Sequence, residues 1–114
     1  MFWDNYKIQL WAPDGKYRRD QLFALELQYL GSVDREMIAE TSVKEIQQQA
    51  SVHSNVLADW HMPLVQLFPD VTTGDELIGL YDPQMPSQFF LNGTLIGAID
   101  DAWLSNYFFE IWLS

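Results

Sequence analysis

The chain has 114 residues, of which 48% are hydrophobic and 15% aromatic, so it can form a single folded domain with an apolar core. Its formal net charge is −10, and residues 45–114 contain no lysine or arginine, which disfavours nucleic acid and anionic membranes as partners. There is no cysteine, which excludes disulfides, thiolate catalysis and cysteine-ligated zinc, and no run is long and apolar enough for a membrane span.

Two strands joined by a turn are expected first. Residues 2–12 alternate between apolar and polar side chains, which predicts a half-buried strand. Residues 12–16 read Ala-Pro-Asp-Gly-Lys, which is typical of a turn. Residues 22–30 alternate again and place four side chains on one face: Phe23, Leu25, Leu27 and Tyr29. We expect these two runs to pair antiparallel.

Two helices are expected next. Ser32 or Asp34 can cap the first helix, whose apolar stripe comprises Met37, Ile38, Val43, Ile46 and Ala50. The second helix starts near Ser54 or Asn55, and its apolar residues are Val56, Leu57, Trp60, Leu64, Val65 and Phe68. Pro63 lies inside this second helix and should kink or divide it.

The last forty residues predict three strands and a helix. Residues 76–81 and 88–91 are apolar and β-prone, and Asn92-Gly93 between residues 89–91 and Leu95 is a strong signal for a two-residue hairpin turn. Asp100 or Asp101 can cap a final helix with one broad apolar face, formed by Trp103, Leu104, Tyr107, Phe108, Ile111 and Trp112.

The expected order is therefore β-β-α-α-β-β-β-α. The strands come in adjacent hairpins without parallel crossovers, so the sheet should be antiparallel, and the grouped helices should cover one of its faces. The sequence predicts an α+β fold in a single domain, residues 1–114.

Three segments carry a resemblance to a known family, together with the passage from residues 23–27 to Ala39. They are residues 67–71 (Leu-Phe-Pro-Asp-Val) with Gly74-Asp75, residues 90–93 (Phe-Leu-Asn-Gly) with residues 96–99 (Ile-Gly-Ala-Ile), and residues 108–113 (Phe-Phe-Glu-Ile-Trp-Leu). In this order and spacing they resemble the chalcone isomerase-like family, especially its bacterial members, over essentially the whole chain. The resemblance implies an open-faced β-sandwich with a cleft between the sheet and the helices.

The same resemblance bears on catalysis. In the plant enzymes of the family a cleft guides ring closure of a chalcone, using an arginine from an opening strand, a tyrosine and a lysine near the first helix, and a threonine-methionine pair on the last helix. Here residues 31–43 hold neither tyrosine nor lysine, and Ile111-Trp112 stand at the place of the threonine-methionine pair. No catalytic residue is therefore assigned, because polarising a carbonyl requires donors and positive charge. Other relatives bind fatty acids without catalysis.

The start of the chain carries a further expectation. The resemblance places additional strands, including the one with the arginine, before Met1, so the domain should lack the opening strands of the family. The strand over residues 2–12 then leaves a sheet edge open, and Phe2 and Trp3 add exposed apolar surface, which favours self-association. No signal peptide is present, so the compartment stays open between periplasm and cytoplasm for a bacterial protein.

The candidate ligand-binding residues lie in three places, each with two interpretations. The loop Lys16–Arg19 is either a clamp for a carboxylate or a solvated hairpin loop. His61 beside Trp60 is either an acid–base group or haem-type ligand, or a partly exposed helix residue. The last helix either lines a ligand cleft or packs the core. The complete set is Lys16, Tyr17, Arg18, Arg19, Tyr29, Trp60, His61, Tyr107, Phe108 and Ile111.

No metal or cofactor site is expected. Asp75-Glu76 and Asp100-Asp101 are the only calcium candidates, and turn and cap chemistry explains both pairs better. The favoured function is a non-catalytic domain that binds a small apolar or amphipathic molecule, fatty-acid-like, between sheet and helices. The alternatives are an intramolecular lyase or isomerase of the chalcone type and a protein-interaction module.

Overall fold

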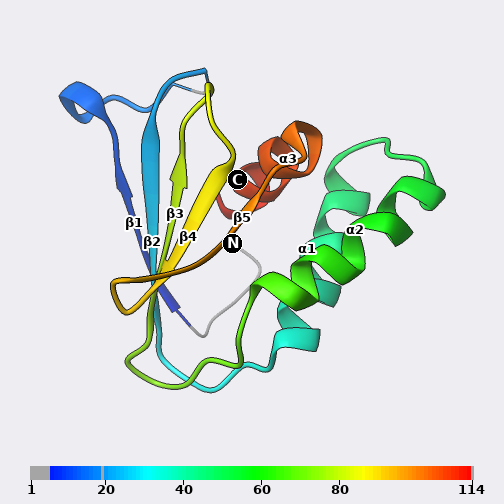
Figure 1. Ribbon diagram of the computed structural model, residues 1–114, viewed down its shortest axis with the longest axis horizontal. Helices are drawn as coiled ribbons and strands as arrows, with labels where there is room; N and C mark the ends of the chain where they lie inside the picture. Colours follow the sequence, from blue (N-terminus) through cyan, green and yellow to red (C-terminus); the bar gives the residue numbers. More distant parts are fainter. Residues whose placement is uncertain (1–5, 19, 114) are drawn as a thin grey trace.

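The computed structural model describes residues 6–18 and 20–113, which form five strands and three helices. The helices all lie on one face of the sheet (Figure 1). The elements in chain order are β1 (Tyr6–Trp11), the short 3₁₀ turn η1 (Pro13–Gly15), β2 (Phe23–Tyr29), α1 (Arg35–Gln49), α2 (Ser54–Leu67), β3 (Glu76–Tyr81), β4 (Ser87–Leu91), β5 (Thr94–Ile99) and α3 (Ala102–Leu113). This arrangement confirms the predicted fold class and element order. No helix in these residues is long and apolar enough to cross a membrane.

The sheet is an antiparallel meander in which the strands follow one another in sequence order, β1-β2-β3-β4-β5. β2 pairs with β1 through Tyr29 opposite Tyr6, and with β3 through Phe23 opposite Tyr81. The β4–β5 turn has positive φ at both Asn92 (50°) and Gly93 (85°), as a two-residue hairpin of the predicted type requires. The helical hairpin α1–α2 is inserted between β2 and β3.

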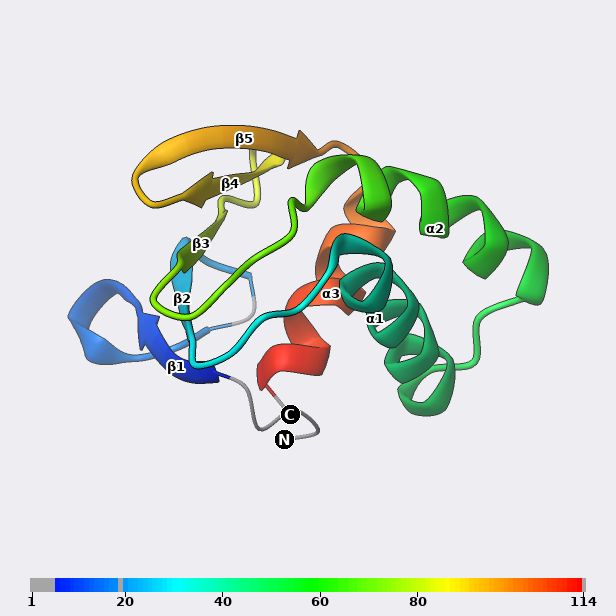
Figure 2. The same cartoon turned by 90° about the horizontal axis from the view of Figure 1, so that it is seen from below.

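The predicted alternation of β2 is confirmed by burial. Its four inward side chains are almost fully buried, whereas Ala24 and Glu26 are half-buried and Gln28 is exposed. In β1, Tyr6 is buried, and the alternate residues Lys7 and Gln9 are exposed. One face of each strand therefore meets the helices, and the other faces away from them (Figure 2).

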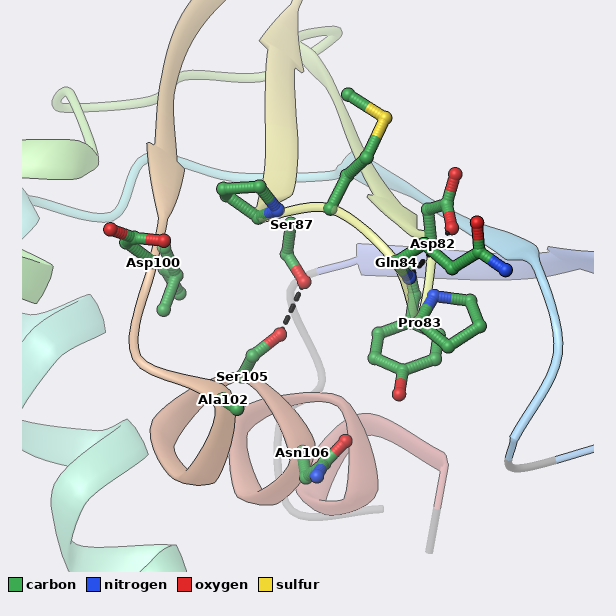
Figure 3. A pocket seen from close by; sticks show the side chains of 12 residues that line it. Asp82, Pro83, Gln84, Ser87, Asp100, Ala102, Ser105 and Asn106 are labelled. Atoms are coloured by element: carbon green, nitrogen blue, oxygen red, sulfur yellow. Dashed lines mark hydrogen bonds between the residues drawn. The ribbon is translucent and has the colours of Figure 1, made fainter.

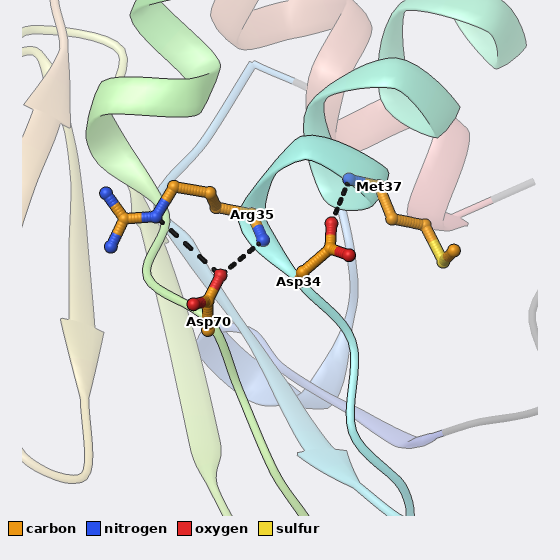
Figure 4. Close-up of polar contacts among 4 residues, drawn as sticks. All are labelled: Asp34, Arg35, Met37 and Asp70. Atoms are coloured by element: carbon orange, nitrogen blue, oxygen red, sulfur yellow. Dashed lines mark hydrogen bonds and ion pairs between the residues drawn. The ribbon is translucent and has the colours of Figure 1, made fainter.

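Carboxylates hold the starts of two helices. Asp34 Oδ1 accepts from the Met37 backbone N–H at 2.8 Å and caps α1, and Asp101 caps α3 in the same way. Asp70 lies just beyond the end of α2, and its Oδ1 accepts from the Arg35 backbone N–H at 2.8 Å and lies 3.7 Å from Arg35 Nε (Figure 4). These contacts attach the first turn of α1 to the chain that leaves α2.

Three details of the helices differ from the sequence expectations. α2 continues through Pro63 to Leu67, so Pro63 does not divide the helix, and the alternative expectation of a kink stays a prediction. Pro63 is exposed, and its neighbours Trp60 and Leu64 are buried against the core. Met37 is 52% exposed, because α1 turns Ile38 toward the core instead. Trp103 is 70% exposed, because it stands on the outward side of the first turn of α3.

Aromatic rings fill the space between the sheet and α3. Phe109 stacks on Phe89 with ring centroids 5.8 Å apart and meets Phe23 edge-on at 5.1 Å. Beneath Phe109 the strand carries Gly79, where an added Cβ would lie 2.8 Å from Phe109 Cε1. The middle of this layer therefore leaves no room for a ligand.

β1 is an edge strand of the described sheet. Met1, Phe2 and Trp3, which entered the expectation of self-association, lie outside the described residues. Self-association through this edge therefore stays a prediction.

We expect Gly93→Val to lower the free energy of unfolding by about 1–3 kcal/mol, because a β-branched residue is strained at positive φ. The matched control is Gly31→Val, since Gly31 does not adopt positive φ and its Cβ would meet open space. Urea unfolding followed by tryptophan fluorescence measures both variants. Equal stability losses in the two variants would contradict the turn assignment.

Candidate functional site

A pocket of about 250 Å³ lies where the β3–β4 connection, the end of β5 and the start of α3 meet. We call it the seam pocket, because it sits at one end of the layer between the sheet and α3 (Figure 3). It is lined by Tyr81, Asp82, Pro83, Gln84, Met85, Pro86, Ser87, Ile99, Asp100, Ala102, Ser105 and Asn106. Polar side chains and apolar rings therefore share one cavity.

Two buried serines face each other in the seam pocket. Ser87 at the start of β4 and Ser105 in the second turn of α3 are hydrogen-bonded through their hydroxyls, and both are at least 95% buried. The Ser105 backbone N–H donates to the Asp101 carbonyl at 2.9 Å, so the helix holds this hydroxyl in place. The pair connects the sheet to α3 and presents hydroxyl groups beside the aromatic core.

The seam pocket is electronegative. Asp82 and Asp100 stand among its lining residues, and none of the residues that line it is a lysine, arginine or histidine. Asp82 Oδ1 accepts from the Gln84 backbone N–H at 2.9 Å, which shapes the β3–β4 connection, and Asp100 is exposed. A carboxylate placed here would meet like charge, whereas a neutral hydroxyl or amide would find donors and acceptors.

The seam continues into a narrow slot of about 10 Å³ that shares Tyr81 and Asn106 with the pocket. Tyr17 closes this slot by packing edge-on against Phe23, with ring centroids 5.1 Å apart. The structure therefore brings one sequence-predicted site residue, Tyr17, to the seam.

The other residues of the predicted basic loop are exposed where the structure describes them. Lys16 and Arg18 flank Tyr17, and Arg18 Nη1 donates to Gln21 Oε1 at 3.5 Å, a long contact. Arg19 lies outside the described residues. The solvated-loop interpretation fits this exposure, and a clamp stays a prediction.

Tyr29 is fully buried beside Tyr6, with ring centroids 6.3 Å apart. Its hydroxyl has no hydrogen-bond partner in the described structure. Burial raises the pKa of the Tyr29 phenol well above its ordinary range, and Tyr6 adds to the shift. Tyr29 therefore stays neutral and lies away from the seam pocket lining.

The remaining predicted residues are distributed over α2 and α3. Trp60 Nε1 donates to Asp101 Oδ2 at 3.1 Å, and the Trp60 ring lies 5.9 Å from that of Tyr107. His61 is half-buried, and its Nε2 lies 3.3 Å from Glu36 Oε2 on α1. Phe108 and Ile111 are core residues with at most 2% exposure. The nine candidates that the structure describes thus lie at several separate positions.

One residue of each acidic pair, Asp75 or Asp101, holds local structure through hydrogen bonds. Asp75 Oδ2 accepts from the Thr72 backbone N–H at 2.8 Å, and its Oδ1 accepts from Asn92 Nδ2 at 3.1 Å. The Thr72 N–H first, and then the Asn92 amide, hold the pKa of Asp75 below its usual range. No group of three or more potential metal ligands forms among the described side chains.

The sequence analysis missed Ser87, Ser105 and Asn106. A signal was present in part: Ser87 stands two positions before inward-facing Phe89 on β4, and Ser105 stands four positions before Phe109 on α3. A small polar residue at an inward position requires a buried partner. No local sequence pattern indicated that these two serines would contact each other.

No protein-family model matches the chain, and no curated protein matches it in sequence. Its fold is similar to the crystal structure of a fatty-acid binding protein from Arabidopsis thaliana, with a TM-score of 0.57 and 12% sequence identity. The match covers 80% of this chain and 47% of the other, so this chain spans about half the length of that protein. That protein has a chalcone isomerase-like fold, which agrees with the fold expected here. At this identity the likeness shows the fold alone.

We expect Ser105→Ala to destabilise the fold by about 1–3 kcal/mol, because the buried Ser87 hydroxyl loses its partner. Ser87→Ala should behave likewise, and the double variant should lose less than the sum of the two. Urea unfolding of the four proteins completes this double-mutant cycle. Strict additivity would show that the two hydroxyls do not support each other.

Proposed function

We propose that this chain is a non-catalytic domain that binds a small amphipathic molecule in the seam pocket. The observation that carries the proposal is the buried Ser87–Ser105 pair, which places hydroxyl groups beside the aromatic layer. Ligand sites place fixed polar groups beside apolar walls, and in the seam pocket polar and charged side chains make up half of the lining residues. The fold shared with a fatty-acid binding protein supports an alkyl chain as the apolar part of the ligand.

The lining gives the ligand an orientation. Its polar end lies against Ser87, Ser105 and Asn106, which offer hydroxyl and amide groups. Its apolar part lies along the rings of Tyr81 and Pro86. Because Ser105 and Asn106 are on α3, the rotation of this helix about its axis determines where the pocket offers polar groups to the ligand.

The charge of the pocket restricts which polar head group the ligand can carry. Asp82 and Asp100 line the pocket without a cation beside them, so a hydroxyl or ester end is favoured over a free carboxylate. The ligand is therefore fatty-acid-like in its alkyl chain and neutral at its head. For a free fatty acid, whose carboxylate needs a cation, the predicted clamp at Lys16 and Arg18 stays the alternative site.

Titration of the ¹⁵N-labelled protein with 1-monooctanoylglycerol, followed by amide chemical shifts, tests the proposal. We expect saturable shifts at Ser87, Ser105 and Asn106, with weaker shifts from octanoate at pH 7. Shifts confined to residues 16–18 with octanoate would place the site at the basic loop instead. The absence of saturable shifts with either probe would contradict ligand binding at the seam.

A matched pair of variants separates the seam pocket from other surfaces. Ala102→Leu fills the pocket from an exposed lining position and should abolish the shifts. Ala58→Leu makes the same change on an exposed face of α2 that lines a different groove, and it should leave the shifts unchanged. Undiminished binding by the Ala102→Leu variant would show that the ligand binds elsewhere on the protein.

We expect no cyclisation of chalcones by this protein. Stabilising a developing oxyanion requires aimed donors and positive charge, whereas Asp82 and Asp100 make the seam pocket negative. Loss of chalcone absorbance, compared with the spontaneous reaction in matched buffer, measures the rate. A protein-dependent rate well above that background would restore the isomerase alternative.

A further inference from the structure

A second cavity lies on the other side of the β5–α3 corner from the seam pocket. It is a groove of about 410 Å³ between α2, the end of β5 and the start of α3, and we call it the α2–α3 groove. Figure 2 shows α2 running beside the end of β5. The groove is lined by Val56, Asp59, Trp60, Pro63, Ala98, Ile99, Asp100, Asp101 and Leu104. Most of these side chains are apolar, and three are carboxylates.

The contacts of Trp60 and Asp101 make the floor of the groove rigid. Asp101 Oδ2 accepts from Trp60 Nε1, while Asp101 Oδ1 accepts from the backbone N–H groups of Trp103 and Leu104 at 2.9 and 3.1 Å. Both carboxylate oxygens of Asp101 are thus engaged in hydrogen bonds within the fold. Asp59 and Asp100 are exposed and make no hydrogen bond or ion pair with the described side chains.

The groove lies between the free edge of a strand and a group of exposed aromatic rings. β5 is an edge strand of the described sheet. Trp103 is 70% exposed and stacks on Tyr107 at 6.3 Å, and Tyr107 in turn contacts Trp60 of the groove at 5.9 Å. An open strand edge beside apolar pockets suits an extended chain, and exposed tryptophan is typical of binding hot spots.

Charge decides what can occupy this surface. Residues 45–114 contain no lysine or arginine, so nothing in that part of the chain offsets Asp59 and Asp100. Anionic lipid and nucleic acid are repelled, and a second copy with a net charge of −10 is disfavoured. A segment that carries lysine or arginine next to apolar side chains is complementary to both features of the groove.

We propose that the α2–α3 groove docks an extended protein segment in which pairs of basic residues follow pairs of apolar residues, so that the face turned to the groove carries both kinds of side chain. Its apolar side chains enter the groove over Val56, Pro63 and Leu104, and its cations meet Asp59 and Asp100. The backbone of the segment runs along the free edge of β5. This interaction is separate from small-molecule binding in the seam pocket and does not depend on it.

The test uses a fluorescein-labelled octapeptide in which two lysines and two valines repeat, with binding to the full chain followed by anisotropy at physiological salt. We expect saturable binding to this lysine–valine peptide, and no comparable binding to a glutamate–valine or a lysine–serine peptide with the same paired repeat. Equal binding of the lysine–serine peptide would show that the apolar groove is not used and would overturn the proposal.

Variants decide whether the groove is the site. Asp59→Asn with Asp100→Asn should weaken binding about tenfold, because both carboxylates meet the cations. Asp20→Asn with Glu40→Gln makes the same change of net charge at exposed positions outside the groove and should change affinity less than about twofold. Equal losses in the two pairs would show unspecific charge attraction and would overturn the proposal.

A third variant tests the contribution of the apolar lining of the groove independently of Asp59 and Asp100. Ala98→Arg places a cation and extra volume in the groove at an exposed strand position and should abolish binding. Amide chemical shifts report whether each variant keeps the parent fold, and they should map the lysine–valine peptide to β5 and α2. Peptide-induced shifts confined to other elements would overturn the assignment of the surface.

Discussion

The close approach of α3 to the sheet sets the arrangement of the rest of the molecule. Phe109 comes so near to β3 that a Cβ at Gly79 would lie 2.8 Å from its ring, and Gly97 on β5 allows Leu67 of α2 a similar approach. Because glycine lacks a side chain, two layers that carry large aromatic residues can pack without a gap. The middle of the layer is therefore closed, and the seam pocket and the α2–α3 groove lie toward its end and its outer side.

This closed interior changes how a ligand-binding chalcone isomerase-like fold can work in this chain. The aromatic layer of Phe23, Phe89 and Phe109 occupies the space that the family resemblance assigned to a cleft. The seam pocket and the α2–α3 groove lie on the two sides of the corner between β5 and α3, and Asp100 lines both of them. One short corner thus positions both a polar pocket, where we propose that a small molecule binds, and an apolar groove, where we propose that a protein segment docks.

Charge distinguishes these sites from the basic loop at the opposite end of the sequence. The seam pocket and the α2–α3 groove are formed mainly by residues after position 54, a part of the chain with carboxylates and no lysine or arginine. Lys16 and Arg18 flank Tyr17, which lines the slot. Neutral or cationic groups are therefore favoured at the corner, and anions are disfavoured there.

The sequence by itself determined the element order, the antiparallel sheet, the Asn92-Gly93 turn and the caps at Asp34 and Asp101, because each follows from local periodicity or backbone preference. Tertiary structure decided which candidates would share a site. The Ser87–Ser105 pair, the exposure of Trp103 and the groove beside β5 depend on how α3 is rotated and how closely it packs. No local period encodes that rotation, since it results from aromatic side chains and glycines that are distant in sequence and meet only in the folded chain.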